Sequence, residues 1–308
     1  MILEFEVTVL GSNSAIPAHG RNQTSQLIQV GGSYILLDCG EGTQIQLRKF
    51  RLKFSRIDFI FISHLHGDHF YGLMGLISSF HLVKRERLLT IFGPRGLDEI
   101  ITVQLKHSNS KLDFPIRFVN THTDGKELIL EEKNFRVYSF PLKHRIACTG
   151  FLIEEKRGLL NLVKEKLLKN KLSIEAINTL RRGNDFLDKN GKVLYSVAEY
   201  THPQKEVRKY AYCSDTIYDP DLIQYIQGVD LLYHEATFDD DEASRAFSTF
   251  HSTAKQAALI AASAKAKKLL LGHYSSRYKD LSPILAQARE VFLESHLSEE
   301  GVTYPVNS

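Results

Sequence analysis

The chain has 308 residues, of which 43% are hydrophobic and 24% are charged. These proportions exclude a disordered or collagen-like chain, and the length allows one large domain or two smaller ones. The net charge is only +3, from 39 basic and 36 acidic residues, so the total alone indicates no nucleic-acid partner. No apolar run approaches the roughly 20 residues that cross a bilayer, and we expect no membrane partner.

Cysteine and histidine are the two informative residue counts. Three cysteines, at positions 39, 148 and 213, are too few and too widely spaced for a disulfide framework. They favour a reducing compartment, from which we expect a cytoplasmic protein. The chain has 13 histidines. Their placement carries most of the functional signal.

In chain order, the first predicted elements are strands. The N-terminal stretch carries Glu4 and Glu6 and is read as a first strand rather than a signal peptide. Apolar runs separated by glycines predict strands at 5–10, 26–30, 34–37 and 57–62.

Strands and helices then alternate along the rest of the chain. Helices are expected at 68–80, 96–105, 252–264 and from Ser282, and strands at 88–94, 115–119, 135–140, 149–153, from Tyr210, at 229–237 and at 268–274. This order predicts an α/β or α+β sandwich with its helices outside.

Residues 152–200 interrupt the alternation. They hold two helix-like stretches, 159–169 and 173–182, and a turn signal at 189–192. Their ten basic and seven acidic residues account for the whole net positive charge of the chain. We interpret the segment as an arm inserted in a single domain, 1–308, with a helical cap as the alternative.

The strongest motif follows the predicted strand 57–62. It places three histidines and one aspartate within six residues, His64, His66, Asp68 and His69. Alternate residues of a strand point to one side, so His64 and His66 can face the same ion. Imidazole and carboxylate ligands suit zinc and similar divalent metals. The alternative is a loop of surface histidines.

Three later strands also end in possible ligands, His144, Asp215 and His273. Each alone is a weak signal, because a strand-end histidine or aspartate is more often a cap. Four such strand ends meeting at one edge of a sandwich supply enough ligands for two metals. Asp215 is the natural bridge, because a carboxylate has two oxygens.

These motifs resemble a known family. His-x-His-x-Asp-His, with the later His, Asp and His, resembles the metallo-β-lactamase superfamily. Within that superfamily, six stretches resemble ribonuclease Z, a tRNA 3′-processing endonuclease: 37–44, 71–73, 141–144, 213–216, 234–238 and 271–278. The resemblance covers nearly the whole chain and implies an αββα sandwich, the metallo-β-lactamase fold, with an inserted arm.

The resemblance implies two Zn²⁺ per subunit. It assigns one ion to His64, His66 and His144 and the other to Asp68, His69 and His273, with Asp215 bridging. It implies that Asp68 accepts a proton from water and that His234, oriented by Glu235, donates one to the leaving oxygen. A buried strand-end histidine is the alternative for His234.

Asp38 matches the first acidic motif of the family. We expect it to orient the histidines, and a strand-end turn carboxylate is the alternative.

The resemblance also implies a substrate and a partner. The expected reaction removes the 3′ trailer from precursor tRNA and leaves a 3′-hydroxyl on the tRNA and a 5′-phosphate on the trailer. The arm of one subunit would serve the active site of the other, which implies a homodimer. The expected substrate-binding residues are Arg21, Asn22, Lys164, Lys166, Lys169, Arg181 and Arg182.

Two departures from the family pattern concern the substrate. His19 replaces the lysine of the Pro-x-Lys-x-Arg-Asn loop, and 152–200 lack the Gly-Pro signature of the family arm.

Two other functions remain open from the sequence. One is a small-molecule phosphodiesterase or hydrolase of the same fold. The other is a non-catalytic RNA-binding or zinc-binding protein.

Overall fold

The computed structural model describes residues 4–203 and 206–307. The chain divides into two compact units, which we call the body (Met1–Glu155 with Arg208–Ser308) and the arm (Lys156–Val207). The strand before the arm, β9 (Cys148–Glu155), belongs to the body, so the arm begins later than residue 152. In the described ranges, no helix is long and apolar enough to cross a membrane.

The body contains two sheets of seven strands each. The first has the order β16-β1-β2-β3-β4-β5-β6 and the second the order β15-β14-β13-β12-β9-β8-β7. The strands of the first sheet are β1 (Phe5–Gly11), β2 (Ser25–Val30), β3 (Ser33–Leu37), β4 (Ile57–Phe61), β5 (Leu89–Gly93), β6 (Ile116–Asn120) and β16 (Thr303–Pro305). The second contains β9 together with β7 (Glu127–Glu131), β8 (Phe135–Leu142), β12 (Lys209–Cys213), β13 (Leu231–Glu235), β14 (Leu269–Gly272) and β15 (Ser295–Leu297).

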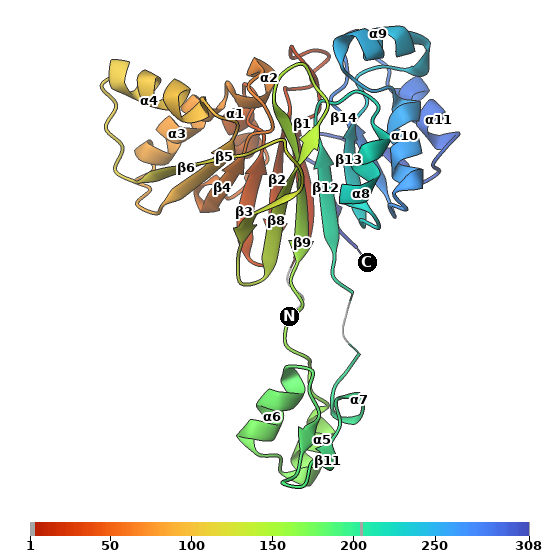
Figure 1. Ribbon diagram of the computed structural model, residues 1–308. Helices are drawn as coiled ribbons and strands as arrows, with labels where there is room; N and C mark the ends of the chain where they lie inside the picture. The colour runs from red at the N-terminus through yellow and green to blue at the C-terminus, as the bar shows by residue number, and fades with distance from the viewer. Residues whose placement is uncertain (1–3, 204–205, 308) are drawn as a thin grey trace. The chain divides into compact units, whose positions relative to one another are not determined.

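Helices flank the two sheets (Figure 1). Those beside the first sheet are α1 (Thr43–Lys49), α2 (Gly67–Phe70), α3 (Leu73–Leu82) and α4 (Leu97–His107); those beside the second are α8 (Ile223–Ile226), α9 (Ala243–Thr249), α10 (Ala254–Ser263) and α11 (Ser282–Arg289). Short 3₁₀ helices lie at Phe54–Arg56, Pro220–Leu222 and Asp240–Glu242. The predicted αββα sandwich is confirmed.

The core between the sheets is rich in aromatic rings. Phe61 of β4 stacks on Phe92 of β5 at 4.4 Å and meets Phe151 of β9 edge-on at 5.2 Å, so its ring joins the two sheets. Two further apolar clusters bury the helices against the outer faces. Helix α3, for example, buries Leu73, Leu76, Ile77 and Phe80, the spacing of one helix face.

The predicted helix 68–80 is interrupted in the structure. It divides into α2 and α3 because the N–H of Gly72 donates to the carbonyl oxygen of Cys39 at 2.9 Å, outside the helix. Other elements were not predicted, notably α1 and the edge strands β7, β15 and β16. The edge strands are short, and β7 and β16 bury few of their residues, which weakens the alternating pattern that marks a strand.

The arm has its own small set of elements. It contains α5 (Lys164–Asn170), α6 (Ile174–Arg181), α7 (Val197–Tyr200) and a hairpin of β10 (Phe186–Leu187) with β11 (Val193–Tyr195). Helix α6 falls inside the predicted stretch 173–182, and α5 overlaps the predicted stretch 159–169 but begins five residues later and ends one residue later. Ala176, Leu180 and Tyr200 are buried and form the centre of this unit. Ser173 caps α6 by accepting a hydrogen bond from the N–H of Ala176.

We expect Gly72→Ala to destabilise the body. A Cβ at Gly72 would collide with the carbonyl oxygen of Gly40, a backbone atom that cannot move away cheaply. Overpacking of this kind lowers the free energy of unfolding by about 1–3 kcal/mol. Chemical denaturation measures the change. Gly75→Ala is the matched control: its Cβ meets only the flexible end of Gln44, so we expect a change below about 1 kcal/mol. Equal losses in the two variants would contradict the argument.

Candidate metal centre

The predicted ligands collect at one edge of the sandwich. Strands β3, β4, β8, β12 and β14 all end at this edge, and the residues that follow them include Asp38, His64, His144, Asp215 and His273. In sheets of this kind, ligands bind beyond the carboxyl ends of the strands. The polypeptide turns sharply at two of these ends, where Asp38 (φ 51°) and His273 (φ 58°) adopt the left-handed conformation.

A first group of four ligand atoms surrounds one point. It consists of His64 Nε2, His66 Nδ1, His144 Nε2 and Asp215 Oδ2. His66 Nδ1 lies 3.0 Å from His64 Nε2 and 3.1 Å from His144 Nε2. Asp215 Oδ2 lies 3.6 and 3.7 Å from the same two nitrogens. Ligands of a tetrahedral zinc ion lie about 3.3 Å apart, so this group fits such an ion.

The second group is equally regular. Asp68 Oδ2 lies 3.4 Å from His69 Nε2 and 3.4 Å from His273 Nε2, and the two nitrogens are 3.2 Å apart. Asp215 contributes its other oxygen, Oδ1, at 3.3 Å from His69 Nε2 and 3.1 Å from His273 Nε2. The two oxygens of Asp215 therefore face different groups, as a bridging carboxylate requires.

Asp38 supports the cluster by contacting the nitrogen of His69 that does not belong to the ligand group. Its Oδ2 lies 2.8 Å from His69 Nδ1 and accepts a hydrogen bond from the hydroxyl of Tyr212 at 2.6 Å. Its Oδ1 accepts from the N–H of Ser63 at 2.7 Å. Asp38 is fully buried. Its contact with His69 Nδ1 fixes the His69 ring so that the other ring nitrogen, Nε2, faces the ligand group.

Glu235 organises the opposite wall. Its buried carboxylate accepts hydrogen bonds from the N–H of Thr216 at 3.0 Å and from the hydroxyl of Thr237 at 2.6 Å. It also lies 2.8 Å from His251 Nδ1. Thr237 in turn lies 2.9 Å from His273 Nδ1. Glu235 therefore orients His251 directly and the metal-ligand cluster through Thr237.

The structure does not bring His234 to this site. Adjacent residues of a strand point to opposite faces, so His234 turns away where Glu235 turns in. The His234 side chain is fully buried, with Nδ1 2.7 Å from the carbonyl oxygen of Glu235. The histidine whose ring contacts the Glu235 carboxylate at this site is His251, which sequence reasoning missed. Its only local signal is its place before Ser252 and Thr253, at the start of α10.

Protonation in the cluster suits metal binding, with one exception. Burial lowers the pKa values of His64, His66 and His144 and keeps these rings neutral. Burial alone would raise the pKa of Asp68, but the neighbouring His69 and His273 outweigh burial and hold the pKa below its ordinary value. The carboxylate is therefore ionised. The exception is His69: burial lowers its pKa, but the surrounding carboxylates, Asp215 first, raise it well above its ordinary value.

The centre opens into a cavity of about 520 Å³. Ser14, Ala15 and Gln23 form part of its wall, and all three come from the loop after β1. The predicted substrate residues Arg21 and Asn22 lie on this loop but do not line the cavity.

Arg21 and Asn22 instead hold the loop in place. Arg21 Nε donates to Asn13 Oδ1 at 3.1 Å. The side chain of Asn22 donates to Glu300 at 2.8 Å. His19, the residue that departs from the family pattern, lies 2.9 Å from the carbonyl oxygen of Ser276.

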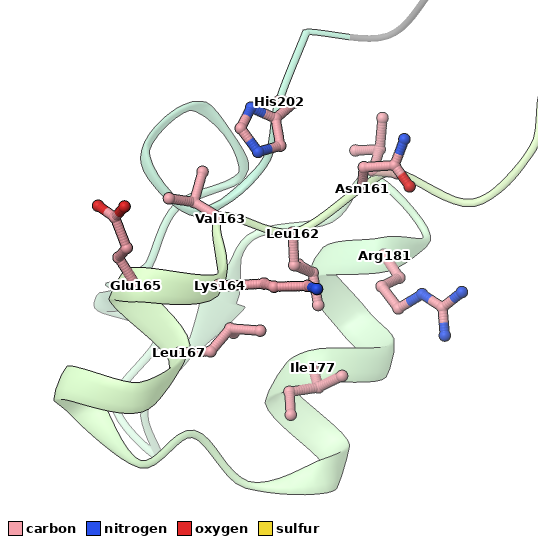
Figure 2. A pocket seen from close by; sticks show the side chains of 10 residues that line it. Asn161, Leu162, Val163, Lys164, Glu165, Leu167, Ile177, Arg181 and His202 are labelled. Atoms are coloured by element: carbon pink, nitrogen blue, oxygen red, sulfur yellow. The ribbon is translucent and has the colours of Figure 1, made fainter. Parts of the chain in front are cut away.

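The arm carries a second cavity, of about 790 Å³ (Figure 2). Leu162, Leu167 and Ile177 contribute apolar side chains to it, and the predicted substrate residues Lys164 and Arg181 also line it. Both cations are exposed. The remaining predicted arm cations do not line this cavity. Lys166 pairs with Glu199 at 3.2 Å and lies over the ring of Tyr200, while Lys169 and Arg182 are exposed.

Comparison with solved structures identifies the class of protein. The chain is similar to the metallo-β-lactamase fold protein YhfI from Bacillus subtilis, with a TM-score of 0.69 and 19% identity over 98% of this chain and 99% of that one. It is also similar to human tRNase Z, short form, with a TM-score of 0.71 and 28% identity over 98% of this chain and 100% of that one. The chain therefore has the metallo-β-lactamase fold.

Comparison with curated sequences identifies the family. The chain is 47% identical to ribonuclease Z of Cytophaga hutchinsonii, over 99% of this chain and 97% of the relative. It is 42% identical to ribonuclease Z of Parabacteroides distasonis, over 98% of this chain and 99% of the relative. The chain belongs to the ribonuclease Z family.

A family model covers part of the same region. Residues 5–159 also belong to the family whose model is described as Anti-Pycsar protein Apyc1. That match contains His64, His66, Asp68, His69 and His144 but ends before Asp215 and His273. The similarity to the two ribonuclease Z relatives, in contrast, extends over 98–99% of the chain.

Metal binding should release a proton at pH 7. His69 holds a proton in the metal-free protein because its pKa is raised, and a ligand must lose that proton to bind a metal. Apparent affinity should therefore fall as the pH falls below 7.

Calorimetric titration of zinc into metal-free protein, in two buffers of different ionisation enthalpy, counts the released protons. We expect at least one per chain. His81→Ala, at the surface beside Asp113, is the control and should leave the count unchanged. A count of zero in the unmodified protein would contradict the argument.

Proposed function

We propose that this protein is a metal-dependent endoribonuclease that removes the 3′ trailer from precursor tRNA. The reaction leaves a 3′-hydroxyl on the tRNA and a 5′-phosphate on the trailer. The observation that carries the proposal is the sharing of Asp215 between two ligand groups, in a chain whose curated relatives are named ribonuclease Z over nearly its full length. The human relative is named a tRNase Z.

We assign two Zn²⁺ to each chain. His64, His66 and His144 would hold one ion, Asp68, His69 and His273 the other, and Asp215 both. A pair of zinc ions supplies a nucleophile at neutral pH and positive charge for the phosphate oxygens. The donor set supports zinc over magnesium, because imidazole nitrogens outnumber the carboxylate in the first group and equal the carboxylates in the second.

Asp68 is suited to accept the proton of the attacking water. Its Oδ2 belongs to the second ligand group, at 3.4 Å from His69 and from His273. Asp68 also lines the cavity, so we assign the uptake of the proton to its other oxygen, Oδ1. The lowered pKa of Asp68 keeps the carboxylate ionised before the reaction begins.

We assign the role of proton donor to His251 in place of His234. His251 lines the cavity, and its Nδ1 faces Glu235, so its Nε2 is the nitrogen available to substrate. Burial lowers the pKa of His251, but the Glu235 carboxylate raises it to about 9. The ring therefore carries a proton at pH 7. That proton passes to the 3′-oxygen of the tRNA as its bond to phosphorus breaks.

The arm is the proposed site of tRNA binding. Within Lys156–Val207 there are eleven basic and six acidic residues, against 28 basic and 30 acidic residues in the body. Positive charge concentrated in one unit suits contacts with the RNA backbone, and such contacts weaken with added salt. We further propose a homodimer, in which the arm of one subunit serves the other, and a cytoplasmic location.

Cleavage of a precursor tRNA tests the proposal. The zinc-loaded protein should cut a transcript with a 3′ trailer once, at the 3′ end of the mature tRNA, and chelation should abolish the cut. The alternative of a small-molecule phosphodiesterase predicts hydrolysis of bis(p-nitrophenyl) phosphate while the transcript stays intact. A non-catalytic binder predicts that neither substrate is hydrolysed. Either outcome with the zinc-loaded protein would overturn the proposal.

The same assay examines the arm. Replacing Lys164 and Arg181 together by glutamate should raise KM for the transcript about tenfold or more and leave bis(p-nitrophenyl) phosphate hydrolysis unchanged, because only the large substrate reaches the arm. The matched control is Lys106→Glu with Lys111→Glu, an equal charge reversal at exposed positions of the body. An equal rise in KM for the control pair would show that net charge alone, rather than the arm, governs binding.

The two histidines give opposite predictions. We expect His251→Ala to lower kcat for the transcript by about 10²–10⁴-fold, the usual contribution of a positioned proton donor. Hydrolysis of bis(p-nitrophenyl) phosphate should fall far less, because its phenolate leaves without a proton.

His234→Gln is the comparison variant, with a side chain that fits the same buried position. It should retain transcript cleavage once its folding has been checked by melting temperature. A larger kcat loss in His234→Gln than in His251→Ala would reverse our assignment.

A further inference from the structure

A large aromatic side chain lies exposed beside the metal centre. Tyr71 directly follows α2, the helix that carries Asp68 and His69, and its side chain is 66% exposed. It lines the same cavity as His66 and Asp68. Burial of an exposed ring is normally favourable, and the catalytic roles proposed above leave this ring without a task.

The ring is held in a defined place. One side of Tyr71 lies against the backbone of Gly67, where a Cβ would collide with the ring atoms. The ring of Phe70, itself buried, meets it at 4.9 Å and 63°. The N–H of Tyr71 donates to the carbonyl oxygen of Gly67 at 2.9 Å, which fixes the backbone of the turn. Despite these contacts, the side chain remains 66% exposed.

The surroundings of the ring suit a single-stranded nucleotide. Ser275, Ser276 and Arg145 also line the cavity that Tyr71 shares with Asp68 and His66. Hydroxyls and a guanidinium can contact phosphate and sugar oxygens, while a flat aromatic face accepts a base of any identity.

We propose that Tyr71 stacks on the unpaired base of a nucleotide that adjoins the scissile phosphate. This inference rests on the proposed function and adds a base-binding subsite to it. Tyr71 is a positioning residue: it forms no bond to the reacting phosphorus but fixes the strand so that one phosphodiester lies at Asp68. Because stacking is tolerant of base identity, the subsite selects an unpaired strand and the position of the cut, not a sequence.

The proposal is tested by combining a substitution in the protein with the removal of a base from the substrate. Two precursor transcripts carry an abasic nucleotide, one on each side of the cut, and a third is unmodified. Tyr71→Ala should lower kcat/KM for the unmodified transcript about 10- to 100-fold, the range expected when one base stack is lost. With the wild-type protein, kcat/KM for one of the two abasic transcripts should be lower than for the unmodified transcript by a similar factor. With Tyr71→Ala, kcat/KM for that abasic transcript and for the unmodified transcript should be the same.

Matched variants isolate the ring. Tyr71→Phe keeps the aromatic face and should restore cleavage close to the wild-type rate. Leu82→Ala removes an exposed apolar side chain outside the cavity, 76% exposed, and should behave as wild type. Bound zinc and melting temperature should be the same for all of these proteins.

The outcomes separate the two levels of the proposal. If the wild-type protein leaves the unmodified transcript intact, the proposed function fails. Two other outcomes would overturn the stacking role of Tyr71. In one, the wild type cleaves the unmodified transcript and Tyr71→Ala has the same kcat/KM. In the other, Tyr71→Ala lowers kcat/KM by the same factor on both abasic transcripts as on the unmodified one.

Discussion

The arrangement of this protein depends on one carboxylate. Asp215 is buried, and its two oxygens face two different groups of histidines and carboxylates. A buried charge is tolerated only when it is paired and hydrogen-bonded or coordinates a metal. The strand ends that surround Asp215 must therefore bring their side chains within 3.1–3.7 Å of its oxygens, and the two sheets must pack in one register to do so.

The surrounding structure explains how these side chains are held in place. The rings of the ligands are fixed from outside the cluster: Asp38 holds His69, the carbonyl oxygen of Phe250 accepts from His144 Nδ1, and Thr237 contacts His273. Two of the strand ends turn through left-handed residues, a conformation that costs free energy in any residue other than glycine. Aromatic packing between the sheets supplies the rigidity that maintains these turns, since Phe61 contacts rings of both sheets.

Sequence reasoning reached the part of this arrangement that is local or regular. His64, His66, Asp68 and His69 lie within one short motif. The distant ligands each follow an apolar strand, which is a weak signal for any one of them, and the family resemblance assigns them to the same site. The alternation of strands and helices predicts an α/β or α+β sandwich with its helices outside, and the family resemblance implies the αββα order. The interruption between α2 and α3 could not be found this way, because it depends on a hydrogen bond from Gly72 to a residue more than thirty positions earlier.

His234 and His251 show the same limit at the level of chemistry. A motif places His234 next to Glu235, and closeness in sequence suggests that they act together. In a strand, however, neighbours point to opposite faces, so the residue beside Glu235 in sequence is directed away from it. The partner of Glu235 comes instead from the turn before α10, sixteen residues later, where only the tertiary fold brings it within 2.8 Å. Residues that act on one substrate atom are selected by their position in space, and a strand-end motif identifies them only when its own geometry already points them to the same side.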